Sequence, residues 1–132
     1  MAFLLTIHST LRWIIIVVAF LAVVKFALGW AMNSSFKGMD RGLAAGFSGL
    51  LDTQVLLGLI YFVWSGLDGS GFPGFRWEHM VIMLVAAALG HVPSRLKALG
   101  DKQRFLYSVI AILGALAMVY VGVMRLPGGW TR

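Results

Sequence analysis

The sequence has no cysteine and few charged residues. Lys and Arg number 11 and Asp and Glu only 5, so charged side chains make up 12% of the 132 residues, about half the fraction of a soluble domain. The lack of cysteine excludes disulfides, zinc–thiolate sites and iron–sulfur clusters held by the chain's own thiolates. No serine–histidine–acid arrangement, phosphate-binding loop or long polar segment is present, so stand-alone hydrolytic or phosphoryl-transfer chemistry is not expected.

Apolar residues are abundant, at 60% of the chain. A globular core of this size could not bury them all, which indicates a lipid bilayer as the second apolar solvent. Four runs, at 2–28, 42–65, 77–98 and 104–125, are each about the length of a transmembrane helix. The third is the shortest, because its apolar part ends near Pro93. Short connections predict an all-α fold, a single domain over 1–132 built as an up-down-up-down four-helix membrane bundle.

Lysine and arginine predict the orientation of this bundle. Seven cations flank the first and third connections, and three flank the second connection and the C-terminus; the first group is Lys25, Lys37, Arg41, Arg95, Lys97, Lys102 and Arg104, and the second is Arg76, Arg125 and Arg132. The positive-inside rule then places both termini on the non-cytoplasmic side of a bacterial cytoplasmic membrane. This distribution also disfavours nucleic acid as the partner of the net +6 charge. No basic segment precedes the first run, so we expect that run to be a retained anchor.

Arg12 and Asp52 are ionisable residues inside predicted spans, where charge is costly. Each lies about 15 Å from the start of its run, which places both near the middle of the bilayer and predicts an ion pair. Such a pair could hold the bundle together, or it could form a proton or quinone site with Gln54 nearby. Small residues precede Asp52 at helical spacing and mark a packing face; they are Gly42, Ala45, Gly46 and Gly49.

The three histidines suggest a haem site. His8 and His79 lie near the outer ends of the first and third runs, where two imidazoles on different helices can hold one b-type haem iron. Arg12, one turn from His8, and Arg76, beside His79, could meet the haem propionates. His91 lies about 18 Å beyond His79 on the same helix, so these two cannot bind one iron.

Other interpretations of these residues stay open. A histidine near a membrane interface often serves only as an amphipathic residue with a hydrated tip. Copper is an alternative metal for His79, because Met80 and Met83 lie nearby. His91 could instead hydrogen-bond Asp52 or a backbone carbonyl, as a buried polar residue of the packing interface.

The chain resembles small four-span bacterial membrane proteins described as cytochrome b-like. The resemblance lies in residues 8–13 (HSTLRW), 52–58 (DTQVLLG), 78–79 (EH) and 90–91 (GH). It implies that one shared constellation contains His8, Arg12, Asp52, His79 and His91.

The leading hypothesis is therefore a small membrane electron carrier rather than a stand-alone enzyme. It would pass electrons between haem b near the outer surface and quinone or a partner redox subunit. One rival is a haem-free accessory subunit of a larger respiratory or photosynthetic complex, and another is a homo-oligomeric transporter of a small solute. The expected partners are the bilayer and either further copies of the chain or a larger membrane complex.

Overall fold

The computed structural model describes residues 2–131, and every regular element among them is helical. Met1 and Arg132 lie outside the described residues, so the terminal cation used in the orientation argument is not placed. The long helices are α1 (Ala2–Ala31), α2 (Gly38–Ser65), α3 (Gly74–His91) and α4 (Asp101–Met124). Shorter helical turns are η1 (Gly66–Ser70), η2 (Val92–Arg95) and η3 (Gly129–Thr131).

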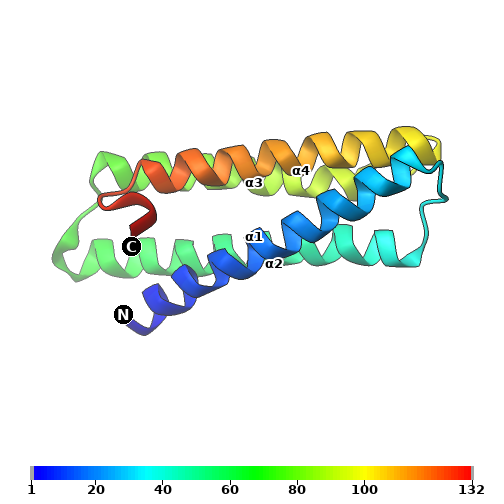
Figure 1. The fold of residues 1–132 in the computed structure, drawn as a ribbon. Coiled ribbons are helices and arrows are strands. Elements are labelled where there is room, and N and C mark those ends of the chain that lie inside the picture. Colours follow the sequence, from blue (N-terminus) through cyan, green and yellow to red (C-terminus); the bar gives the residue numbers. More distant parts are fainter. Residues whose placement is uncertain (1, 132) are drawn as a thin grey trace.

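The four long helices form one bundle (Figure 1). The α1–α2 and α3–α4 connections lie at one end, whereas the α2–α3 connection and both termini lie at the other. Helices α1 and α3 each pack against both α2 and α4. No direct packing between α1 and α3 occurs in residues 2–131. These two histidine-bearing helices therefore stand at opposite corners of the bundle.

Three of the helices are long and apolar enough to cross a membrane: α1, α2 continued through η1, and α4. Helix α3 is not among them. It begins at Gly74 and ends at His91, earlier at both ends than the run at 77–98 predicted. Pro93 explains the early end, because proline lacks an N–H and disfavours α-helical geometry in the residue before it. The chain continues there as the 3-10 turn η2.

Asp40 fastens α1 to the start of α2. Its carboxylate accepts a hydrogen bond from the Lys37 backbone N–H at 2.9 Å, which caps α2. The other carboxylate oxygen lies 2.8 Å from Lys25 Nζ on α1. Asp40 is almost fully buried, so both of its oxygens have the partners that burial demands.

Packed phenylalanine rings close the bundle at the end where α1 joins α2. The ring centres of Phe26, Phe36 and Phe105 lie 5.0–6.0 Å apart, in tilted arrangements typical of aromatic cores. Gly29 makes room for this cluster, since a Cβ there would lie 2.6 Å from the Phe105 ring. At the opposite end Phe62 packs against Phe72 and Trp77, and the cavity described next lies beside these rings.

Candidate functional site

A cavity of about 330 Å³ lies between the four helices near the end that carries both termini. All four helices contribute to its wall, and most of the lining is apolar. The residues that carry charge or a titratable nitrogen are His8, Arg12, Arg76 and His79. Among residues 2–131, no aspartate or glutamate side chain lines it. A volume of this order is sufficient for a small organic ligand.

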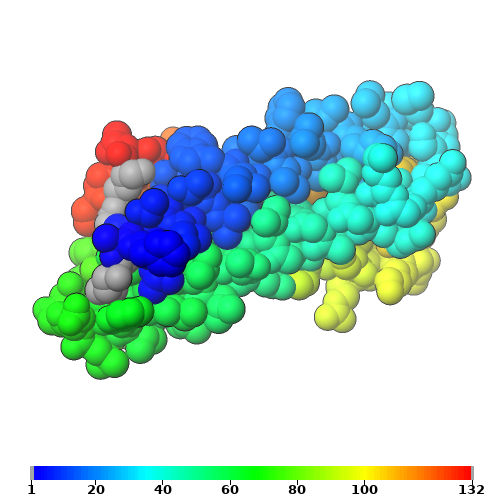
Figure 2. Space-filling model, turned by 90° about the horizontal axis from the view of Figure 1, so that it is seen from below, coloured from blue at the N-terminus to red at the C-terminus, as the bar shows by residue number. Residues whose placement is uncertain are grey.

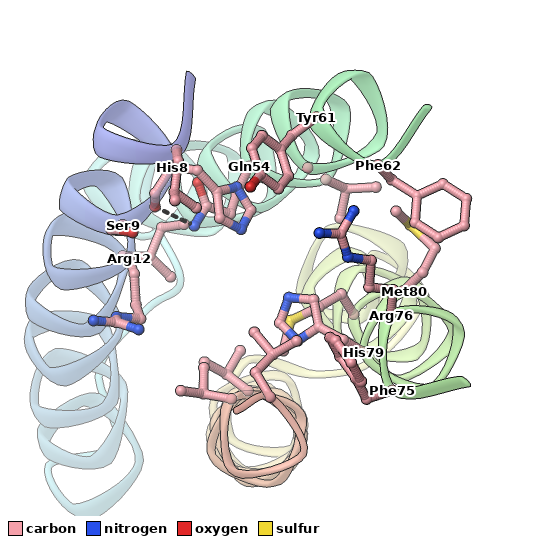
Figure 3. Close-up of a pocket in the computed structure, with 18 of the residues that line it drawn as sticks. His8, Ser9, Arg12, Gln54, Tyr61, Phe62, Phe75, Arg76, His79 and Met80 are labelled. Carbon is pink, nitrogen blue, oxygen red and sulfur yellow. Dashed lines mark hydrogen bonds between the residues drawn. The ribbon is translucent and has the colours of Figure 1, made fainter. Parts of the chain in front are cut away.

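His8 and His79 face this cavity from opposite corners of the bundle (Figure 3). Their ring centres are 6.4 Å apart and their planes are inclined by 72°. The sequence predicted similar depths for these two side chains, and they meet across the cavity although α1 and α3 do not pack directly against each other.

The hydrogen bond of His79 shows which of its two ring nitrogens carries the proton. Its Nδ1 lies 2.8 Å from the Gly122 carbonyl oxygen of α4. A carbonyl only accepts, so Nδ1 carries the proton and donates. In the neutral ring the lone pair then resides on Nε2, which is the arrangement found in metal-bound histidines.

His8 is held through its backbone rather than through its ring. Gln54 Nε2 donates to the His8 carbonyl oxygen at 2.7 Å. His8 Nδ1 and Gln54 Oε1 are buried and have no hydrogen-bond partner among the described residues. Buried polar atoms are ordinarily satisfied, so these two atoms point to a bound ligand. Gly58 keeps the space beside His8 open, since a Cβ there would lie 3.0 Å from His8 Cε1.

Two arginines line the cavity. Arg12 is buried, and its guanidinium carbon lies 5.1 Å from the Trp13 ring centre and 5.0 Å from that of Trp130, within range of cation–π attraction. Arg76 donates to the Ser65 hydroxyl and lies 5.8 Å from the Tyr61 ring centre. Each guanidinium is a group that can bind the carboxylate of a ligand.

The prediction of an ion pair between Arg12 and Asp52 is wrong. Asp52 instead pairs with His91, whose Nε2 lies 2.8 and 2.9 Å from the two carboxylate oxygens. This matches the alternative in which His91 hydrogen-bonds Asp52. Neither residue lines the cavity. The constellation implied by the resemblance is therefore divided, with His8, Arg12 and His79 at the cavity and the Asp52–His91 pair elsewhere.

The donor set of the cavity fits a metal that brings its own equatorial ligands. No group of three or more His, Cys, Asp or Glu side chains within residues 2–131 is placed to hold a metal ion. If both imidazoles bound one metal, with bonds of about 2.0–2.1 Å as for zinc, their ring centres would lie at most roughly 6 Å apart. The 6.4 Å separation is close to that value. Haem would add an apolar ring for the apolar walls and two carboxylates for the arginines.

Sequence reasoning missed the residues that support this site. Ser65 binds Arg76, Gly122 supplies the carbonyl that orients His79, and Gly58 leaves space beside His8. Gly58 ends the 52–58 segment and Gly122 lies in a stripe of small residues on the fourth run. Glycines that serve a cavity and glycines that only pack helices look the same in sequence.

No family model, curated protein or solved structure matches this chain. Its function is therefore inferred from the cavity and the residues around it.

Proposed function

We propose that this chain is an integral membrane electron carrier of the bacterial cytoplasmic membrane that binds one b-type haem. In this proposal the four helices run up-down-up-down and both termini lie on the non-cytoplasmic side. Three helices of sufficient length and apolarity support the membrane location. The concentration of lysine and arginine around the α1–α2 and α3–α4 connections, which share one end of the bundle, supports the orientation.

The observation that carries the haem proposal is the separation of His8 and His79. The two imidazoles line the same cavity with their ring centres 6.4 Å apart, on helices that do not pack against each other. The proton on His79 Nδ1 leaves Nε2 as the ligand atom. The bond to the Gly122 carbonyl also increases the basicity of that nitrogen and fixes the ring orientation.

Bound in this cavity, haem would supply reversible one-electron transfer. The protein's contribution is to hold the group and to set the charge around it. Arg12 and Arg76 would bind its carboxylates and would favour the more negatively charged, reduced form, which would raise the reduction potential. Most of the wall around it would be apolar. We further propose quinone or a partner redox subunit as the exchange partner, reached from the non-cytoplasmic end.

The test is haem binding by the purified full-length chain. The protein is titrated with hemin in detergent, and absorption spectra are recorded before and after reduction with dithionite. We expect a six-coordinate spectrum of the bis-imidazole type. His8→Ala and His79→Ala should each abolish that spectrum, and His91→Ala should retain it, because His91 lies outside the cavity.

Two outcomes would reject the assignment. Loss of haem only in the His91→Ala variant would place the ligand set elsewhere. No haem binding by the unmodified chain in excess hemin would leave the haem-free accessory subunit as the better description. Gly58→Leu provides a third measurement, because it fills the space beside His8 without removing a ligand. It should weaken hemin binding while the helical content stays unchanged.

A further inference from the structure

One stretch of α2 differs from every other outward-facing helical surface of the bundle. Helices α1 and α4 expose large apolar side chains such as Phe20, Leu21 and Ile110, as lipid-facing helices do. Between Met39 and Leu56, α2 exposes none of that kind. Its exposed residues there are small or polar: Arg41, Gly42, Ala45, Gly46, Gly49, Asp52 and Thr53. Figure 2 shows this part of α2 on the surface, between α1 and the α3–α4 region.

The glycines of this stretch border open space. A Cβ added at Gly42, Gly46 or Gly49 would meet nothing within 4 Å. Spacings of four and three residues place all three on one side of the helix. Small residues at such spacing let a second helix approach closely in a membrane, where van der Waals packing and not the hydrophobic effect drives association. We name Gly42, Gly46 and Gly49 with the adjoining Asp52 and His91 the glycine face.

The ion pair at the edge of this face is incompletely covered. The side chains of Asp52 and His91 are 52% and 43% exposed, although Asp52 lies about halfway along the 28-residue α2. A helix of that length spans about 42 Å, so its middle falls within the hydrocarbon layer if α2 crosses the bilayer. Ionisable groups at that depth normally face protein or water and not lipid.

We propose that a second copy of this chain packs on the glycine face and forms a two-fold dimer. This inference rests on the membrane location proposed above but not on haem. A two-fold interface places the same patch on both partners, so it must be self-complementary. The glycine face meets this condition, because the glycines of the two copies can pack against each other. The Asp52–His91 pair of each copy can then cover the same pair of its partner. An unrelated subunit would need its own matching acid and base.

Cysteine cross-linking tests this contact directly, because the natural chain has no cysteine. Gly42→Cys, Gly46→Cys and Gly49→Cys are made singly, and each full-length chain is reconstituted at high lipid excess into phosphatidylcholine vesicles. A disulfide requires Cα atoms about 4.4–6.8 Å apart. We expect oxidation to give a cross-linked dimer for at least one of them. Val17→Cys on α1 and Leu113→Cys on α4 are the controls, since both positions are exposed outside the face, and these should stay monomeric.

A second variant separates packing from chance collision. Gly46→Leu adds a large side chain where the monomer has open space, so the fold of the single chain should tolerate it. The added bulk should weaken dimerisation in energy-transfer measurements by about tenfold or more. Ala117→Leu, at an exposed small residue of α4, should leave it unchanged.

The outcomes decide between occupants. Equal cross-linking at the face and at the control positions, or an unchanged dimer in Gly46→Leu, would overturn the proposal. Cross-links to another protein in native membranes, with monomers in pure vesicles, would assign the face to a different subunit and likewise overturn it. Monomers that bind an added lipid-soluble quinone at this face would do the same. Hemin binding by Gly46→Leu reports separately on the cavity, so failure of the dimer and failure of the haem proposal are distinguishable.

Discussion

Gly122 is the residue that lets α4 approach α3 closely enough to orient His79. A Cβ at Gly122 would lie 3.1 Å from Ile82 Cγ2 and 3.7 Å from His79 Nδ1. The nearest atom to this Cβ would be Met83 Cε, the end of a flexible side chain, so a substitution would require Met83 to move and Ile82 to shift slightly beside the hydrogen bond from His79 to the Gly122 carbonyl. The orientation of the imidazole therefore depends on a backbone group, which no polar side chain of the lining replaces.

Asp52 and His91 should be energetically coupled, and Asp52 and Arg12 should not. Asp52 accepts from His91 through both carboxylate oxygens. Removing either partner leaves the other polar group unsatisfied in an apolar environment. We expect Asp52→Ala and His91→Ala to lower the free energy of unfolding non-additively, with a coupling of about 1 kcal/mol, the size measured for hydrogen bonds between membrane helices.

The measurement is a double-mutant cycle on the purified protein, unfolded by denaturant in mixed micelles. The matched control is the cycle between Asp52→Ala and Arg12→Ala, whose effects should add. A large coupling in the control cycle, together with none between Asp52 and His91, would restore the pairing expected from sequence.

At the scale of the elements, the apolar runs located the helices well because length and apolarity act locally. The runs at 2–28 and 104–125 correspond closely to α1 and α4. The run at 77–98 placed its end too late, because Pro93 ends the α-helix at His91 and the polar residues beyond it form a 3-10 turn. The cap at Asp40 is equally local, since it involves only a neighbouring backbone N–H.

Side-chain partners across helices were harder to predict, because depth alone does not fix direction. Arg12 and Asp52 were placed at one depth, yet α1 presents Arg12 to the cavity while Asp52 faces His91 on α3. His8 and His79 do lie together, because α1 and α3 occupy opposite corners and both side chains line the cavity between them. A different arrangement of the four helices would have separated them. Rotation of each helix about its axis is set by the whole packed bundle, and one sequence without its packing does not supply it.

Glycines buried between helices should tolerate alanine far less than glycines in ordinary contact. At Gly29 a Cβ would lie 2.6–2.9 Å from three atoms of the Phe105 ring, which is itself packed against Phe26 and Phe36. Gly29→Ala should therefore destabilise the protein by about 1–3 kcal/mol, the usual cost of overpacking a rigid core.

Gly114→Ala is the matched control on α4. Its Cβ would lie 3.5 Å from a Leu89 methyl, an ordinary contact, so helix propensity should dominate and stabilise the protein by up to about 1 kcal/mol. Thermal unfolding followed by circular dichroism in detergent compares the two. Equal effects of both substitutions would show that the rings packed around Phe105 rearrange to accommodate the added methyl group.

The two ends of the bundle differ: one has a packed core, and the other contains the cavity. Aromatic rings and the Lys25–Asp40 pair fill the end where α1 meets α2. At the other end the same four helices enclose the cavity with His8 and His79. In the proposed orientation the filled end is cytoplasmic. A bound redox group would then lie toward the outer surface, accessible to partners on that side.

Labelling of single cysteines tests this orientation. Ser35 in the α1–α2 connection and Ser70 at the end of η1 are both exposed, and their connections lie at opposite ends of the bundle. Because seven of the eleven cations flank the α1–α2 and α3–α4 connections, the positive-inside rule retains those connections in the cytoplasm. In intact cells a membrane-impermeant thiol reagent should therefore label Ser70→Cys and spare Ser35→Cys, and permeabilisation should expose both. Labelling of Ser35→Cys alone would show that the bundle has the opposite orientation, with the cavity on the cytoplasmic side. Labelling of both positions before permeabilisation would contradict a helix crossing between them, and with it the membrane bundle itself.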